Sequence, residues 1–167
     1  VFYALQTFDQ LLLGDVCATA HRQIKSVRID DSPRFGYRAL MLDPARHFLP
    51  VSDVKHFIDW MARFKYNVLQ LHLTDDQGWR MEIKTYPQLV QKGAFRKEGG
   101  GADGPDNGYY TQQQLKELIA YAAARNIEIV PELDVPGHTV AALAAFPEWG
   151  CKLGGADSGG VGKTDNR

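Results

Sequence analysis

The sequence lacks both a strong excess of charge of one sign and a long apolar run. Its 19 basic and 20 acidic residues give a formal net charge of -1 over 167 residues. No basic surface field is therefore available to attract nucleic acid or an anionic membrane. No apolar run reaches the roughly 20 residues that a membrane-spanning helix requires, and no segment has the basic start and apolar stretch of a signal peptide. We predict neither a nucleic-acid partner nor a membrane span.

Cysteine is scarce, and no metal or nucleotide motif is present. Cys17 and Cys151 lie far apart and match neither a metal-ligand spacing nor a redox motif. We expect both to be plain thiols, with the alternative that Cys151 pairs with a cysteine outside this sequence. No predicted strand is followed by a glycine-rich turn with dinucleotide or P-loop spacing, so we predict no cofactor. With 44% hydrophobic and 23% charged residues, the composition is that of an ordinary globular domain.

Three short apolar runs, at residues 39–42, 68–73 and 127–133, are typical of buried strands. Amphipathic helices are predicted between them. We expect Ser52 or Asp53 to cap the first helix, Asn67 to close it, and Thr111 to cap the second helix. The expected apolar faces are Val54, Phe57, Ile58, Met61 and Phe64 in the first helix, and Leu115, Leu118, Ile119 and Ala122 in the second.

The remaining segments carry weaker patterns. Near-helical spacing of apolar residues predicts a short helix over residues 2–12, and alternation of apolar and polar residues predicts a half-buried strand over 24–31. The stretches 99–108 and 152–167 are rich in glycine and have no periodicity, so both are predicted to be loops.

The alternation of strands and helices predicts an α/β fold with a parallel sheet covered on both faces. Ligands bind at the carboxyl ends of such strands. Charged pairs follow the three strands, namely Asp43 with Arg46, Asp75 with Asp76, and Asp134 with His138. These strand ends favour a (β/α)8 barrel over a doubly wound fold, but a whole barrel needs about 250 residues. The residues alone therefore leave either a small open sheet or a truncated barrel.

Three segments together carry a family resemblance: RALMLDPARHF at 38–48, HLTDDQGWR at 72–80 and PELDVPGH at 131–138. Their residue identities, order and spacing resemble those of glycoside hydrolase family 20, the β-N-acetylhexosaminidases, over roughly residues 33–149. The resemblance implies the first three strand-helix units of a truncated (β/α)8 TIM barrel. It also implies that residues 1–32 end a preceding accessory α+β domain and that residues 33–167 form the N-terminal part of the catalytic barrel.

Arg46, Asp75 and His138 are the principal site candidates. A guanidinium can grip two adjacent sugar hydroxyls, although an ion pair with Asp43 or another carboxylate is the simpler interpretation. A carboxylate beside an imidazole fixes its tautomer and raises its basicity, whereas a strand-end cap and a buried histidine are the structural alternatives. The resemblance implies that Arg46 holds sugar hydroxyls. It also implies that Asp75, rather than Asp76, pairs with His138 in catalysis.

Glu132 and Trp79 are second-tier candidates. A buried acid at Glu132 would need a partner, and Trp79 could stack on a sugar face, although single aromatic residues more often pack. A metal site formed by His72, Asp75 and Asp76 is disfavoured, because alternation along a strand would point His72 and Asp75 to opposite faces. We therefore predict no metal. Arg38, at the start of the first strand, is assigned a supporting role.

The resemblance implies hydrolysis of terminal N-acetyl-D-hexosamine residues from glycans that end in N-acetylglucosamine or N-acetylgalactosamine. In this family the substrate's own acetamido group attacks, assisted by an adjacent Asp-Glu pair. The 167 residues contain no Asp-Glu dipeptide, so we expect this portion alone to be inactive. The alternatives are a barrel glycosidase that releases a disaccharide and a non-catalytic sugar-binding or scaffold domain. Only the resemblance suggests an exported, periplasmic or lysosomal protein.

Overall fold

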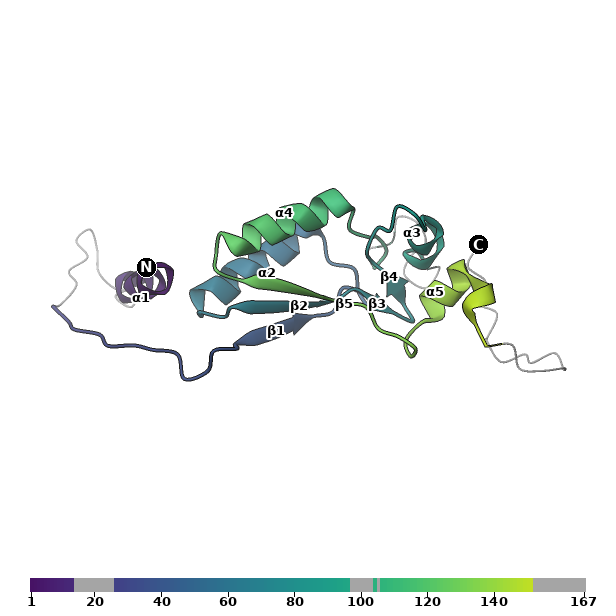
Figure 1. Ribbon diagram of the computed structural model, residues 1–167. Coiled ribbons are helices and arrows are strands. Elements are labelled where there is room, and N and C mark those ends of the chain that lie inside the picture. Colours follow the sequence, from purple (N-terminus) through teal and green to yellow (C-terminus); the bar gives the residue numbers. More distant parts are fainter. Residues whose placement is uncertain (14–25, 97–103, 105, 152–167) are drawn as a thin grey trace.

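A parallel sheet of three strands forms the centre of the computed structural model, which describes residues 1–13, 26–96, 104 and 106–151 (Figure 1). The strand order is β1 (Ala39–Leu42), β2 (Val68–His72) and β5 (Glu128–Glu132). All pairings are parallel, with Leu69 opposite both Leu40 and Ile129. The three predicted strands are thus confirmed, and β2 and β5 each end one residue before the predicted end.

Helices α2 (Val51–Arg63) and α4 (Gln112–Ala123) lie on the same side of this sheet (Figure 1). Parallel crossovers are right-handed by default, and two such crossovers in one direction, from β1 to β2 to β5, place both helices on one face. The expectation of a sheet covered on both faces is therefore not met within the described residues, where Met41 on the sheet is 55% exposed. Three parallel strands in sequence order occur in a barrel and also in one half of a doubly wound sheet.

The main core lies between the sheet and the two helices. Alternate residues of each strand point toward the helices, so one set of strand side chains meets the helical apolar faces. The core members from the sheet include Leu40, Leu69, Leu71 and Ile129, and those from the helices include Val54, Ile58, Met61, Leu118 and Ala122. These residues confirm most of the predicted apolar faces. Phe64 and Ile119 are exceptions, because both are exposed.

The helix ends agree with the sequence at α4 and differ at α2. Thr111 forms a capping box with Gln114 at the start of α4, as predicted. The predicted cap of α2 is wrong, because the N-cap is Pro50, whose side chain has no hydrogen-bonding group. Asn67 lies beyond the end of α2, where its side chain binds the backbone of Arg38 and Gly36 instead.

A second, smaller layer follows the strand ends. It contains the hairpin β3 (Thr74–Asp75) and β4 (Gly78–Trp79) and the short helices α3 (Gln88–Gly93) and α5 (Val140–Ala145). A 3-10 turn over Pro147–Trp149 follows α5. The buried centre of this layer is Leu89, Ala142 and Ala145, with Trp79, Ile83 and Phe146 packed around it. None of these short elements was predicted, since strands of two residues and helices of three to six residues are too short to show a readable pattern.

The N-terminal segment forms helix α1 (Phe2–Leu13), as predicted. The predicted strand at 24–31 is wrong over 26–31, which has no strand partner and is exposed throughout; residues 24 and 25 lie outside the described residues. Also outside them lie Cys17, residues 97 and 98, residues 99–103 and 105 of the glycine-rich stretch, and the tail at 152–167. Cys151 is an exposed free thiol. Among the described helices, none has the length and apolar character needed to cross a membrane.

Candidate functional site

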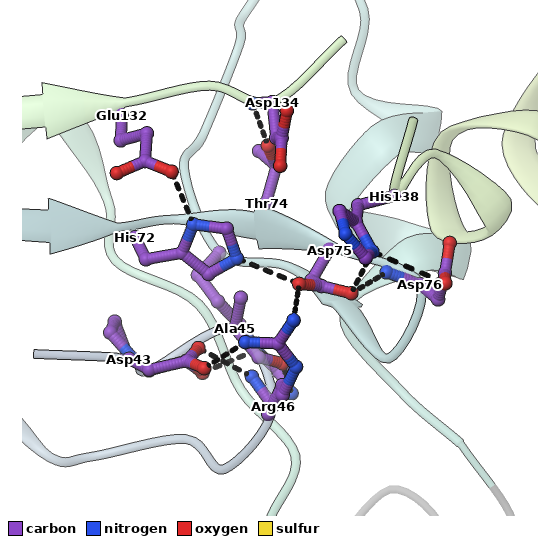
Figure 2. A network of polar contacts seen from close by, with 12 residues as sticks. Asp43, Ala45, Arg46, His72, Thr74, Asp75, Asp76, Glu132, Asp134 and His138 are labelled. Atoms are coloured by element: carbon purple, nitrogen blue, oxygen red, sulfur yellow. Dashed lines mark hydrogen bonds and ion pairs between the residues drawn. The ribbon is translucent and has the colours of Figure 1, made fainter. Parts of the chain in front are cut away.

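Polar side chains gather at the carboxyl ends of the three parallel strands (Figure 2). Parallel strands bring their ends to one edge, so residues far apart in the sequence meet there. The members are Asp43 and Arg46 after β1, His72 on β2, Asp75 and Asp76 in the following hairpin, and Glu132, Asp134 and His138 from β5 and its loop. The structure thus brings together all of the predicted site residues except Trp79.

Asp75 is the centre of this network and is 1% exposed. Its Oδ2 lies 2.6 Å from Nη2 of Arg46 and 2.7 Å from Nε2 of His72. Its Oδ1 accepts the backbone N–H of Asp76 at 2.6 Å and lies 3.3 Å from Nδ1 of His138. Burial alone would raise the pKa of Asp75, but these donors and the nearby positive charges outweigh burial and lower it. Asp75 is therefore an ionised carboxylate at neutral pH.

His72 contradicts the expectation that it points away from Asp75. Strand β2 ends at His72, and the chain then turns into the β3–β4 hairpin, in which Asp75 pairs with Gly78. Alternation holds only along a continuous strand, so the bend returns the Asp75 side chain to the side of His72. The other ring nitrogen of His72, Nδ1, lies 2.8 Å from Oε1 of Glu132. Both ring nitrogens therefore face carboxylates.

Arg46 makes the expected ion pair with Asp43 and, in addition, one with Asp75. Its Nη1 lies 2.5 Å from Oδ2 of Asp43, and its backbone N–H donates to Oδ1 of the same residue. The hydrogen bond with Asp43 raises the pKa of the Arg46 guanidinium. The side chain is 42% exposed, so part of this positioned cation remains accessible to a ligand.

His138 lies beside both aspartates of the hairpin. Its Nδ1 is 3.3 Å from Asp75 and 3.6 Å from Asp76, and its side chain is half exposed. Asp76 also accepts the backbone N–H of Val140, the first residue of α5. The nearer contact supports the choice of Asp75 as the partner of His138, while Asp76 holds the start of the next helix.

Glu132 and Trp79 lie in different surroundings. Glu132 has the partners that its position requires, since His72 binds one carboxylate oxygen and Gln70 donates to the other. The hydrogen bond from Gln70, and after it that from His72, lowers the pKa of Glu132. Trp79 packs in the second core, and its indole N–H donates to the carbonyl of Met81. These contacts favour a packing role for Trp79.

Arg80 is a residue whose importance the sequence reasoning missed. It is completely buried, and its guanidinium donates to backbone carbonyls of the described residues. Two of the acceptors, Pro44 and Ala45, directly precede Arg46. Nothing in the residue pattern distinguishes Arg80 from a solvated arginine, because its acceptors come from distant parts of the sequence. Arg38, directly before β1, similarly donates to the backbone carbonyls of Lys65 and Phe35.

Two groups of three side chains in the described part of the chain lie close enough to share a cation. They are His72 with Glu132 and Asp134, and Asp75 with Asp76 and His138. Hydrogen bonds and ion pairs already engage both ring nitrogens of His72 and both oxygens of Asp75. A cation would have to displace these donors, so the arrangement favours a hydrogen-bonded network over a metal centre.

The parallel sheet and its charged strand ends define an α/β protein whose candidate site lies at the carboxyl ends of the strands. The family profile described as "Glycosyl hydrolase family 20, catalytic domain" matches residues 35–166. The chain therefore belongs to glycoside hydrolase family 20.

Several relatives agree with this assignment. The chain is 49% identical to a beta-hexosaminidase of Akkermansia muciniphila over 89% of its own length, and 47% identical to one of Porphyromonas gingivalis over 90%. It spans 30% and 20% of the length of these relatives. The GH20 beta-N-acetylhexosaminidase of Streptomyces coelicolor A3(2) superposes with a TM-score of 0.80 at 42% identity, covering 90% of this chain and 30% of that structure. A mutant Streptomyces plicatus beta-hexosaminidase, solved in complex with its product GlcNAc, matches with a TM-score of 0.79 at 44% identity, again over 90% of this chain and 30% of that one.

Proposed function

We propose that the protein containing this chain removes terminal non-reducing N-acetyl-D-hexosamine residues from β-N-acetylhexosaminides. The reaction is a retaining hydrolysis in which the 2-acetamido oxygen of the substrate attacks its own anomeric carbon. The observation that carries the proposal is the contact of Arg46, Asp75 and His138 at the strand ends of a family 20 sheet. Because the chain spans only part of its relatives, this activity is assigned to the whole protein.

Arg46 is the proposed sugar-binding residue. Asp43 and Asp75 hold its two terminal nitrogens, so its planar fork has a fixed direction before the sugar arrives. A positioned guanidinium can donate to neighbouring hydroxyls with little loss of side-chain entropy. The exposed part of the side chain is the part that remains for the ligand.

Asp75 and His138 are the proposed supporting pair. The buried carboxylate faces Nδ1 of the imidazole, which favours a proton on that nitrogen and leaves Nε2 to interact with the reacting groups. In this role the pair would orient and tune the residue that transfers the proton. His138 can reach such a residue, because half of its side chain is exposed.

The proton donor itself is proposed to come from outside this chain. Asp75 and Glu132 both have lowered pKa values, so each is ionised at neutral pH and unsuited to protonate a leaving oxygen. No Asp-Glu dipeptide occurs in the sequence. We infer that an Asp-Glu pair elsewhere in the protein orients the acetamido group and protonates the leaving group.

The test compares two aryl glycosides that differ only in the acetamido group. The full-length protein should hydrolyse the aryl N-acetyl-β-glucosaminide and leave the aryl β-glucoside almost untouched. Arg46→Lys should lower kcat/KM by roughly 100-fold, because a misdirected cation no longer holds the sugar, whereas Arg34→Lys at an exposed position should change little. Hydrolysis of both substrates at equal rates would refute the substrate-assisted mechanism. Sugar binding without any turnover would instead support a non-catalytic sugar-binding protein.

The isolated chain provides a further discriminating measurement. Without the acid pair it should not turn over the N-acetyl-β-glucosaminide. Turnover by this chain that Glu132→Gln abolishes would place the proton donor at Glu132, and the roles assigned here to Asp75 and His138 would then be wrong.

A further inference from the structure

His72 has two carboxylate partners, one on each ring nitrogen (Figure 2). Nε2 lies 2.7 Å from Asp75 and Nδ1 lies 2.8 Å from Glu132, and the residue is 5% exposed. An ionised carboxylate can only accept hydrogen bonds, and a neutral imidazole has only one N–H to donate. Two bonds of this kind therefore require protons on both ring nitrogens, and His72 is a buried imidazolium.

The other way to satisfy both contacts is a protonated carboxylic acid facing a neutral imidazole. At Asp75, Arg46 and the backbone N–H of Asp76 already donate to the carboxylate. At Glu132, Gln70 donates to the oxygen that His72 does not bind. Donors of this kind stabilise the ionised form of both acids. The proton therefore resides on His72. Although burial lowers the pKa of His72, the hydrogen bonds to both acids outweigh burial and raise the pKa above its ordinary value.

We propose that His72 is a positioning residue that acts as a fixed, doubly protonated cation and holds Asp75 in place for Arg46 and His138. The proposal rests on the function proposed above, for which it identifies a further required residue. His72 links Asp75 in the hairpin to Glu132 at the end of β5. The imidazolium thus sets the direction from which Asp75 meets the sugar-binding arginine.

The charges around His72 explain why its proton matters. Two anions, Asp75 and Glu132, contact the ring directly, and Asp43 at the end of β1 adds a further negative field. Asp134 lies near the Glu132 side. Arg46 shares Oδ2 of Asp75 with His72, and His138 faces Oδ1 of Asp75. Loss of the proton would place a nitrogen lone pair against a carboxylate oxygen. Asp75 or Glu132 would then move away, and Asp75 would no longer align Arg46.

The first test reads the protonation state directly and does not depend on activity. The full-length protein is labelled with 15N-histidine, and His72→Gln assigns the His72 signals in the NMR spectrum. We expect protons on both ring nitrogens of His72 at pH 7, with a titration midpoint above the ordinary value of 6.5. A neutral ring with one unprotonated nitrogen at pH 7 would overturn the proposal, whatever the enzyme hydrolyses.

The second test separates positioning from packing by the pH dependence of kinetics. His72→Gln should lower kcat/KM for the N-acetyl-β-glucosaminide by roughly 100-fold at pH 6, as expected for a misplaced site group. The ratio of the wild-type kcat/KM to that of the variant should decrease above the titration midpoint of His72. Above that pH the wild type has lost the charge that the variant lacks. His56→Gln, at an exposed histidine on α2, is the matched control and should behave as the wild type.

A ratio that stays constant with pH would show a packing role for His72 and would overturn the proposal. A wild-type protein without hydrolytic activity would refute the proposed function, and the NMR titration would still decide the charge state of His72. The two failures are therefore distinguishable.

Discussion

Replacement of Arg80 tests how far the geometry of the strand ends depends on one buried guanidinium. Arg80 is 0% exposed, and burial lowers its pKa to about 10, so it remains protonated at neutral pH. Its donors join three stretches of chain: the loop after β1, the end of α3 and the loop before α4. The acceptors are the backbone carbonyls of Pro44, Ala45, Ala94, Asp106 and Gly108.

The expected magnitude follows from these five carbonyls. A hydrogen bond to a charged group contributes about 1.5 to 3 kcal/mol, and a buried acceptor without a partner costs about 1 to 3 kcal/mol. Arg80→Met would remove every donor, but it would also remove a buried cation whose desolvation costs several kcal/mol. We expect a net loss of about 3 to 5 kcal/mol in the free energy of unfolding. Arg80→Lys keeps the charge with only three donors, and should lose about 2 kcal/mol.

Urea unfolding followed by tryptophan fluorescence measures these losses in the full-length protein, with Trp79 adjacent in the sequence as a reporter. Arg34→Met is the matched control, because Arg34 is exposed and should lose no more than about 0.5 kcal/mol. If Arg80→Met unfolds at the same urea concentration as the control, the carbonyl contacts do not stabilise the fold and the argument fails. Equal losses in Arg80→Met and Arg80→Lys would show that shape, rather than the number of donors, decides stability.

Three further predictions concern neighbouring features. Gly78→Ala should destabilise by about 1 to 3 kcal/mol in urea unfolding, because its Cβ would lie 2.3 Å from Cζ of Arg80; an unchanged midpoint would contradict the close approach. Thr111→Ala removes the cap of α4 and should cost about 1 kcal/mol in thermal unfolding. The Tm should fall in acid as pH drops through the lowered pKa of Asp75, since its contribution is complete only above the ordinary value of 3.8. It should also fall as pH rises above 6.5 through the raised pKa of His72, and a Tm independent of pH would refute both assignments.

Short apolar runs predicted the three strands of the sheet, and periodicity predicted its two covering helices, which are long enough for the helical pattern to repeat. The core residues Leu69 and Leu71 on β2, and Ile58 on α2, each follow from a pattern of several residues. The same method failed where partners decide the structure. The alternating pattern at 26–31 is not a strand, since no other segment of the described chain pairs with it. Alternation describes which face a residue would occupy, and it does not supply the neighbouring strand that a sheet requires.

Side-chain partners in the site were predictable only in part. Asp43 and Arg46 are three residues apart in one loop, and their ion pair was expected as an alternative to sugar binding. His72 and Asp75 are also three residues apart, yet their contact was missed because a hairpin begins between them. Short hairpins depend on local backbone contacts that leave little trace in the pattern of residue types.

The hairpin itself depends on the buried arginine that follows it. The backbone N–H of Arg80 donates to the carbonyl of Leu73, which fixes the end of the hairpin against the end of β2. Its guanidinium occupies the space that a side chain at position 78 would need, so a glycine is required opposite Asp75. The same guanidinium holds the carbonyl of Ala45 beside Arg46. Arg80, although it is completely buried, therefore sets the relative positions of the Asp75 carboxylate and the Arg46 guanidinium.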